Sequence, residues 1–150
     1  MLIERYYTLP LSLCLLIFVL VGRVSYALEC QSETYNDISF LESTDTFSPY
    51  DKIFLKIFCD EIPTGKQTFY VKWTKDDLGV IRTDKQEVEV VSPDGFMVYF
   101  WIKLHKSGVL SSGLTNKDFD DTYYGDWTVD VFVDDLSISV NKFSVKEGSE

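Results

Sequence analysis

The densest group of oxygen-bearing side chains in this sequence begins at residue 116. Asn116, Asp118 and Asp120 alternate along the chain, and Asp121 follows directly. Alternating oxygen side chains on a loop are typical ligands of calcium, which takes about six to eight oxygens. The EF-hand pattern is not met, because Asp121 stands where that loop needs glycine and Trp127 stands where it needs glutamate. An irregular calcium site at Asn116, Asp118 and Asp120 is one hypothesis, and a solvated acidic loop is the default interpretation.

Two tyrosines follow this acidic loop. Exposed aromatic side chains bury a large area at low entropic cost, so binding modules use them to grip sugars or partner proteins. We therefore take the candidate binding surface to be Tyr123 and Tyr124 together with Asp118, Asp120 and Asp121. The alternative is that one tyrosine packs inward and the other is a single exposed aromatic without a role.

A catalytic interpretation would have to rest on His105, the one histidine of the chain. As a general base it would act on a nucleophile, but the chain has no nucleophile elbow. It also has no His-Glu pair at metal-binding spacing. We interpret His105 as a surface residue, predict no catalytic residues and expect a protein that is not an enzyme. A hydrolase is the alternative, since the members of a Ser-His-Asp triad need only meet in space.

Residues 1–27 are typical of an export signal. An apolar run over residues 11–21 precedes Ser25 and Ala27, the small residues that signal peptidase requires. The run is shorter than the roughly 20 apolar residues of a membrane-spanning helix, which is the alternative. We expect cleavage before Leu28, a periplasmic or secreted protein, and no stable membrane anchor after cleavage.

Cleavage would remove Cys14 and leave Cys30 and Cys59. An even number of cysteines in an oxidising compartment favours one disulfide. The alternative is two free thiols, with Cys59 buried in a strand. Two cysteines and one histidine are a poor zinc site. Lipid attachment at Cys30 is not expected, because Glu29 stands where a lipoprotein signal has a small residue.

The charge of the chain limits its partners. The 150 residues carry a formal net charge of −10, and removal of the leader leaves 12 basic and 23 acidic residues, or −11. Such a charge repels nucleic acid and anionic membranes, so we expect no nucleic-acid partner. It would suit a basic protein or a divalent cation, although a solvated acidic surface is the plainer interpretation.

The elements that would position these residues are strands. After residue 30 the apolar residues recur with period two, and helical periodicity is nearly absent. A stretch rich in Ser, Gly, Asn and Asp over residues 107–126 predicts a loop. Strands are expected over 53–59, 68–73, 80–82, 87–90, 96–104, 127–133 and 136–145.

Seven or eight short strands imply two packed antiparallel sheets, with a small closed barrel as the alternative. We expect Trp73, Trp101 and Trp127 between the sheets. The strand at 96–104 is predicted to be central because both of its faces are apolar, and a bulge is predicted near Asn141 and Lys142. The expected organisation is a signal peptide at 1–27, an N-terminal segment tied by the disulfide at 28–46, a β-sandwich at 47–146 and a tail at 147–150.

The segment from Gly125 to Asp134 reads Gly-Asp-Trp-Thr-Val-Asp-Val-Phe-Val-Asp, and Phe143-Ser144-Val145 follows it. This resembles the last two strands of immunoglobulin-like sandwich domains from bacterial envelope proteins. Phe47-Ser48-Pro49, the turn at 62–65 and the strand ending at Trp73 are similar to their opening hairpin. The resemblance implies an all-β, immunoglobulin-like antiparallel β-sandwich of about seven to eight strands. It offers no catalytic residues and implies an extracytoplasmic binding or accessory module.

The sequence thus predicts an exported, non-enzymatic module that acts through protein–protein contacts in the cell envelope. The alternative function is a carbohydrate-binding module that uses the same tyrosines, with calcium as its one candidate cofactor. An acidic inhibitor of a basic secreted protein is one version of the first hypothesis.

Overall fold

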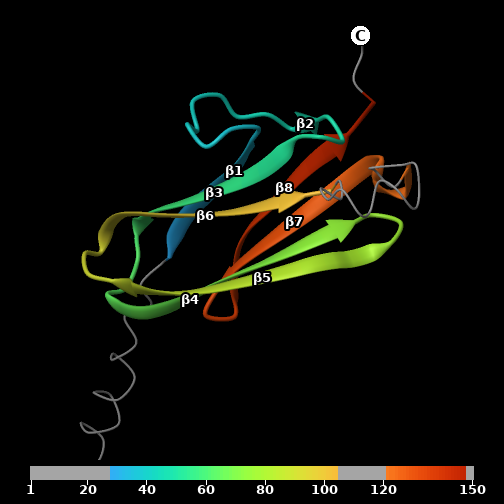
Figure 1. Cartoon of the computed structure of the whole chain (residues 1–150). Coiled ribbons are helices and arrows are strands. Elements are labelled where there is room, and N and C mark those ends of the chain that lie inside the picture. Colours follow the sequence, from blue (N-terminus) through green and yellow to red (C-terminus); the bar gives the residue numbers. More distant parts are fainter. Residues whose placement is uncertain (1–27, 105–120, 148–150) are drawn as a thin grey trace, which may run out of the picture.

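The computed structural model of the chain describes residues 28–104 and 121–147 (Figure 1). The leader at 1–27, His105 and the calcium hypothesis at Asn116, Asp118 and Asp120 lie outside these described residues. The described part contains short 3-10 helix η1 and eight strands. Their bounds are β1 (Glu29–Tyr35), β2 (Thr46–Phe47), β3 (Lys52–Glu61), β4 (Gly65–Lys75), β5 (Gly79–Val90), β6 (Asp94–Lys103), η1 (Asp121–Tyr123), β7 (Gly125–Val133) and β8 (Leu136–Val145).

The strands form two sheets that pack face to face. One sheet has the order β1-β3-β6 and the other has the order β2-β8-β7-β4-β5. All ladders are antiparallel except the two-residue pairing of β2 with β8. This division of strands between two sheets is that of an immunoglobulin-like sandwich, so the predicted fold class is confirmed.

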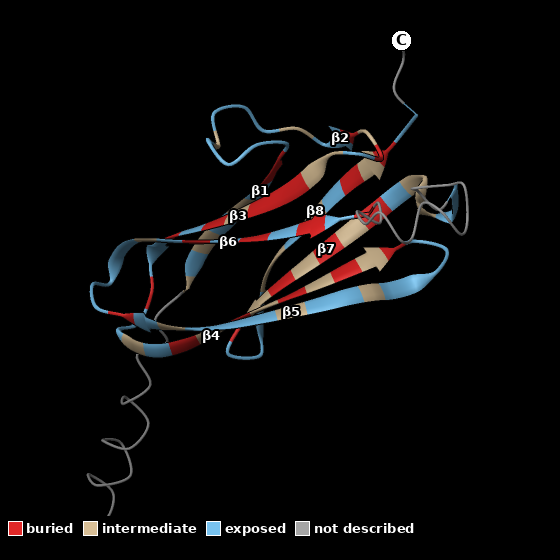
Figure 2. Ribbon diagram, viewed as in Figure 1, coloured by how far each residue is buried: buried red, intermediate tan, exposed pale blue. Residues whose placement is uncertain are grey.

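The core lies between the sheets and follows the period-two alternation. Ile53, Leu55 and Ile57 of β3 are fully buried, and so are Phe69 and Val71 of β4. Successive side chains of a strand point to opposite faces, so each strand contributes every second residue to the core. Buried and half-buried residues alternate along β4 and β7 in Figure 2, whereas β5 is almost wholly exposed.

The structure corrects two predictions about β6. Trp73 and Trp127 are fully buried between the sheets as predicted, but Trp101 lies on the outer face with 40% of its surface exposed. The strand is also not central, because it is the last strand of the three-stranded sheet. The second apolar face of β6, with Met97 and Tyr99, is an exposed surface that no other layer of the described structure covers.

The structure also corrects the predicted extent of β5 and the predicted position of the bulge in β8. The short strands predicted at 80–82 and 87–90 are parts of one continuous strand, β5, because an edge strand tolerates charged residues on both faces. The bulge lies at Ile138 rather than near Asn141 and Lys142, since Val131 pairs with Ser139 and the next residue of β7 pairs with Ser137.

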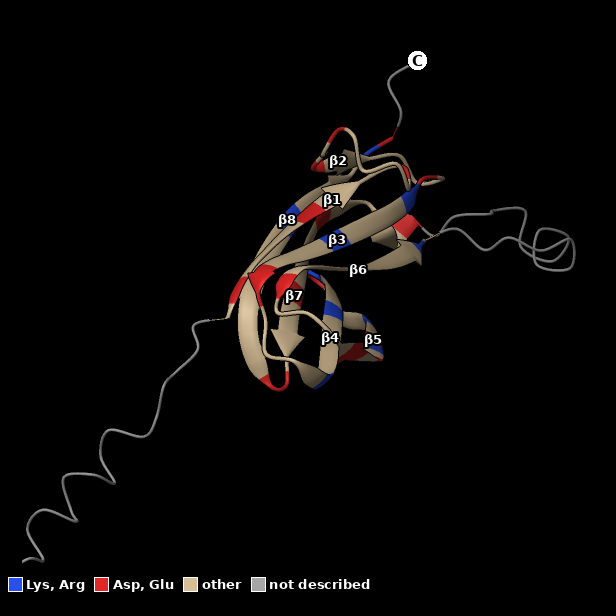
Figure 3. Cartoon of the chain, turned by 90° about the vertical axis from the view of Figure 1, so that its left-hand side faces the viewer, with Lys and Arg blue, Asp and Glu red and all other residues tan. Residues whose placement is uncertain are grey.

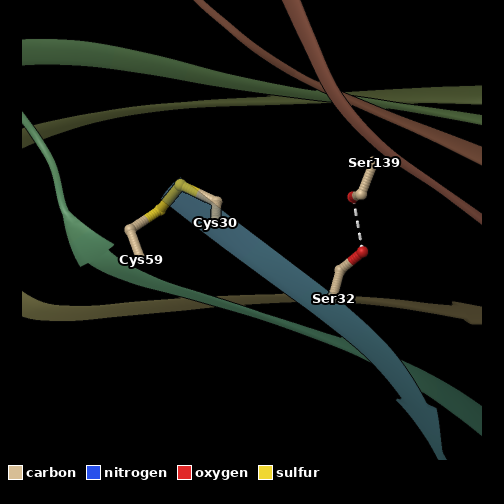
Figure 4. The surroundings of a disulfide bond; sticks show 4 residues. All are labelled: Cys30, Ser32, Cys59 and Ser139. Carbon is tan, nitrogen blue, oxygen red and sulfur yellow. Dashed lines mark hydrogen bonds between the residues drawn. A yellow bond between two sulfur atoms is a disulfide. The ribbon is translucent and has the colours of Figure 1, made fainter. Parts of the chain in front are cut away.

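β1 is linked to the adjacent strand of its own sheet and to the opposite sheet. The predicted disulfide joins Cys30 to Cys59 on the adjacent strand β3 (Figure 4). Across the sheets, Ser32 Oγ lies 2.5 Å from Ser139 Oγ, and the Asn141 amide donates to Ser32 Oγ. The bulge at Ile138 precedes Ser139 and Asn141, whose side chains both contact Ser32 of β1.

Residues 28–104 and 121–147 contain no helix with the length and apolar character that crossing a membrane requires.

Candidate functional site

The outer side of the three-stranded sheet carries a cluster of aromatic residues that we call the aromatic face: Tyr35, Phe40, Phe54, Tyr99 and Trp101. Tyr35 is opposite Phe54 in the β1–β3 ladder, and Phe54 is opposite Trp101 in the β3–β6 ladder. Residues opposite each other in a ladder share one face of the sheet, so the strand register itself assembles this cluster.

Phe40, from the segment after β1, covers one end of the cluster. Its ring centroid lies 5.2 Å from that of Tyr35, 6.1 Å from that of Phe54 and 5.7 Å from that of Tyr99. The backbone of Phe40 has a φ of 53°, in the left-handed region that disfavours residues with a Cβ. The aromatic contacts offset that backbone strain, and Tyr99 and Trp101 stay 40% exposed beside them.

Basic side chains lie over these rings. Lys52 Nζ is 4.0 Å from the Trp101 ring centroid and 4.6 Å from that of Phe54. Lys56 Nζ is 5.0 Å from the Tyr35 ring centroid. Cations at such distances are attracted by the negative ring faces. The basic positions of β3 are visible in Figure 3, and they give the aromatic face a local positive charge on an acidic protein.

Tyr35, on strand β1, lies at one edge of the aromatic face. Its hydroxyl donates to Glu33 Oε2 at 2.5 Å. Burial raises the pKa of Tyr35 above its usual value, and the hydrogen bond to Glu33 raises it further. Tyr35 therefore stays neutral through the physiological range, and its ring keeps the negative face that attracts the Lys56 ammonium.

A groove runs beside the aromatic face, between the edge strands of the two sheets. This β5–β6 groove has a volume of about 670 Å³. One wall is the continuous run from Phe96 to Trp101 on β6. The other wall is formed by residues of β5, namely Arg82, Asp84, Lys85, Gln86 and Val88.

Arg82 joins the groove to the aromatic face. Its guanidinium makes an ion pair with Asp84 at 2.7 Å, and its Nε donates to the same carboxylate oxygen at 2.8 Å. The other oxygen of Asp84 accepts from Nε1 of the fully buried Trp73 at 2.9 Å. Thus oriented, Arg82 reaches across to β6, where its guanidinium carbon lies 5.6 Å from the Trp101 ring centroid.

A second aromatic pair lies on the outer face of the five-stranded sheet. The Tyr70 and Phe132 ring centroids are 5.5 Å apart, and Lys72 Nζ lies 5.0 Å from that of Phe132. A hollow of about 660 Å³ is lined by these three residues with Thr68, Lys85, Asp134 and Asp135. This pair is smaller than the aromatic face.

The predicted binding residues that the structure describes lie elsewhere. Tyr123 and Tyr124 are half-buried and pack against the core, and Asp121 is exposed at the start of η1. The Tyr123 ring is T-shaped on Trp127 at 5.8 Å, and its carbonyl accepts from Trp127 Nε1 at 2.9 Å. Asp118 and Asp120 lie outside the described residues, as does Asn116.

The sequence reasoning missed the aromatic face and the groove. The available signal was the alternation of Met97, Tyr99 and Trp101 on one side of β6, a pattern that in sequence is the same as the second buried face of a central strand. In the described ranges, no three His, Cys, Asp or Glu side chains are grouped so as to hold a metal ion.

Comparisons with known proteins bear on the fold alone. No protein-family model matches the chain, and no curated protein matches it. An immunoglobulin-like protein from Pseudomonas aeruginosa is 11% identical with a TM-score of 0.42, over 83% of this chain and 95% of that one. An alkylpurine DNA glycosylase from Pseudomonas fluorescens bound to DNA with an abasic site analog is 11% identical with a TM-score of 0.45, over 80% of this chain and 31% of that one.

A β-glucosidase from Listeria innocua in complex with laminaribiose is 11% identical with a TM-score of 0.42. The match covers 79% of this chain and only 16% of the glucosidase, so the chain spans a small part of these larger enzymes. The TM-scores are too low to carry any functional inference. On its own strand order, the chain is an immunoglobulin-like β-sandwich, and its described part carries the aromatic face and the β5–β6 groove.

Proposed function

We propose that this chain is an exported, non-enzymatic binding module that contacts a partner protein through the aromatic face. The observation that carries the proposal is the exposure of Tyr99 and Trp101, each 40% exposed, beside Met97 at 49%. Contiguous exposed apolar surface costs solubility and marks interaction sites in soluble proteins. Tyrosine and tryptophan supply most of the binding energy in many interfaces, so this face is suited to hold a partner.

Export is part of the proposal and is supported by the Cys30–Cys59 disulfide, because such bonds persist in oxidising compartments. The charges over the aromatic face predict the charge of the partner surface that contacts it. The net charge of the chain favours a basic partner at long range, but Lys52 and Lys56 lie over the rings of the face. An acidic or neutral patch of the partner is therefore expected against the aromatic face.

The test compares two double variants with the wild-type protein. Tyr99→Ser with Trp101→Ser removes the two exposed rings, and Leu136→Ser with Val140→Ser removes two exposed apolar side chains of β8 as a matched control. Each protein is immobilised and used to capture ligands from the envelope and culture fluid of its organism. A captured protein is then purified and its Kd measured by calorimetry.

We expect the Tyr99 and Trp101 double variant to bind the purified partner at least about tenfold more weakly, as loss of a central aromatic contact produces. The β8 control should bind like the wild type. Equal affinity of all three proteins for the partner would contradict the proposal that the aromatic face is the contact surface.

A carbohydrate-binding function is the second candidate, and one observation favours it. Trp101 lies beside Arg82 and Asp84, so a stacking ring and hydrogen-bonding groups border the same groove. A glycan array, probed first with calcium and then with a chelator, tests this function. Binding that Trp101→Ala abolishes would support it, and silence in both conditions would exclude it.

A further inference from the structure

One edge of the sandwich differs from the others in how it is protected. β6 pairs with β3 on one side only, so the N–H and C=O groups of alternate residues point away from β3, toward the groove. Exposed strand edges are templates for pairing with another chain, and proteins commonly blunt them with charges, proline, bulges or short length.

β6 has none of these protections along its middle. It is ten residues long, it contains no proline, and its ladder with β3 shows no register shift. Charged residues occur only at its two ends, Asp94 and Lys103. The side chains between them are apolar or aromatic apart from Gly95.

The other edges of the described structure are protected. β5 carries charged residues through most of its length, including Arg82, Asp84 and Glu87. β1 and β8 are held together by the hydrogen bonds of Ser32, β8 carries the bulge at Ile138, and β2 is only two residues long. The unprotected strand is therefore the one that borders the β5–β6 groove.

The shape of the groove fits an extended segment. Phe96 to Trp101 line it without a break, although alternate residues of a strand point to opposite faces. Side chains of both faces can line one hollow only where the backbone edge between them forms the wall. Six residues at about 3.3 Å each make a wall roughly 20 Å long, which matches a short strand.

We propose that the β5–β6 groove takes an extended peptide segment of the partner protein, which adds to β6 as a fourth strand of the three-stranded sheet. This inference rests on the proposed binding function and names the form of its partner. Strand addition derives affinity from main-chain hydrogen bonds and specificity from alternate side chains. One set of peptide side chains lies beside Met97, Tyr99 and Trp101 and is apolar. The other set faces Gln86 and Val88 of β5.

The charges around Trp101 define one further feature of the peptide. Lys52 Nζ lies 4.0 Å from the Trp101 ring centroid and the Arg82 guanidinium carbon lies 5.6 Å from it. Two cations thus flank the end of the groove, and one of them, Arg82, is paired with the carboxylate of Asp84. An acidic residue of the peptide lies at this end, where both cations attract it.

The probe is a random library of displayed peptides about ten residues long, enough to span β6 at roughly 3.3 Å per residue. Peptides are selected on the wild-type protein and counter-selected on Met97→Glu, which places a charge on the open edge. Val140→Glu, a similar change on β8, is the matched control, since the two side chains are 49% and 56% exposed. Thermal melting checks that both variants are folded.

Selected peptides should alternate apolar and polar residues and carry an acidic residue toward one end. Their binding, measured by fluorescence anisotropy, should weaken at least about tenfold with Met97→Glu and stay unchanged with Val140→Glu. Lys52→Gln should weaken it severalfold and lower its dependence on salt. Lys72→Gln should have no effect, although Lys72 also lies over aromatic rings, on the opposite sheet.

Backbone pairing is tested directly by amide hydrogen exchange of the wild-type protein. Alternate amides of β6 should exchange fast in the free protein and slowly in the peptide complex. N-methylation of one alternating set of peptide amides should abolish binding, and N-methylation of the other set should not. Failure to select any peptide that distinguishes Met97→Glu from the wild type would overturn the proposal, and so would unchanged exchange in β6.

The outcomes separate this inference from the proposed function. A partner whose binding depends on Tyr99 and Trp101 but leaves the β6 amides unprotected would refute strand addition and keep the binding module. Protection of the same amides in a self-associated protein, seen by light scattering without peptide, would show that a second copy occupies the edge and would overturn the assignment to a partner peptide.

Discussion

The disulfide between Cys30 and Cys59 should contribute a large part of the stability of the sandwich. It links two residues that are 29 apart in sequence. Its removal by reduction changes no side-chain atoms other than the two sulfur atoms. In the reduced protein β1 keeps its ladder with β3 and the hydrogen bonds of Ser32, so we expect the native fold to persist with a lower unfolding free energy.

The magnitude follows from the length of the closed loop. For a separation of 29 residues, the chain-entropy relation gives about 12 cal/mol/K, or about 3.6 kcal/mol at 25 °C. Unfolding entropy is about 2.1 cal/mol/K per residue, which amounts to about 250 cal/mol/K for a domain of roughly 120 residues. The ratio of these two quantities predicts that Tm falls by about 14 °C on reduction.

The assay is thermal unfolding followed by tryptophan fluorescence, with and without a phosphine reductant. Cys59 is fully buried, so the protein is unfolded, reduced and refolded before the scan. The Cys30→Ala, Cys59→Ala double variant is the control, because its Tm should not respond to the reductant. A reduced wild-type protein that melts within about 2 °C of the oxidised one would refute the loop-entropy reasoning.

Three further predictions concern the backbone and one ion pair. Because Phe40 has a φ of 53°, Phe40→Gly should be more stable than Phe40→Ala by about 1 kcal/mol in urea unfolding, the reverse of the usual order. Gly125 has a φ of 110°, and a Cβ there would lie 3.2 Å from Lys75 Nζ, so Gly125→Ala should lower the unfolding free energy by about 1–3 kcal/mol. The Lys75 ammonium donates to Asp77 at 2.5 Å, and this hydrogen bond lowers the pKa of Asp77 below its usual value. The ionised Asp77 therefore stabilises the fold above its unfolded pKa of about 4, and this stabilisation is lost as the pH falls through the lowered pKa of the folded state. The urea midpoints of the wild type and Asp77→Asn should differ at neutral pH and converge in acid.

The fold followed from the sequence where alternation is clean. In β7 and in the middle of β4, from Phe69 to Trp73, every second residue is apolar, and the structure buries those residues. β5 was harder to predict because an edge strand does not need an apolar face, so its charged middle looked like a break. The predicted central position of β6 was wrong for a physical reason. An aromatic strand face has the same sequence pattern whether another layer of the protein or a partner covers it.

The candidate site was beyond sequence reasoning for a related reason. The groove is formed by strands from different sheets, and the pairing of Arg82 with Trp101 across it depends on how the sheets are stacked. The aromatic face depends on strand register, which brings Tyr35, Phe54 and Trp101 into one row. The groove leaves no local pattern, and the alternation along β6 shows only one strand of the aromatic face and not whether that face is covered. The acidic loop with its tyrosines does leave a local pattern, which drew the sequence prediction there.

The Cys30–Cys59 disulfide also determines how the domain responds to a pulling force. Cys30 is the second residue of β1, so tension applied to the start of the domain passes through sulfur into β3 and cannot peel β1 from the sheet. The 29-residue separation between the two cysteines is shielded from extension, which shortens the stretched length of a pulled molecule by about 100 Å at roughly 3.5 Å per residue. When the domain unfolds under force, its gain in length is therefore smaller than its number of residues suggests.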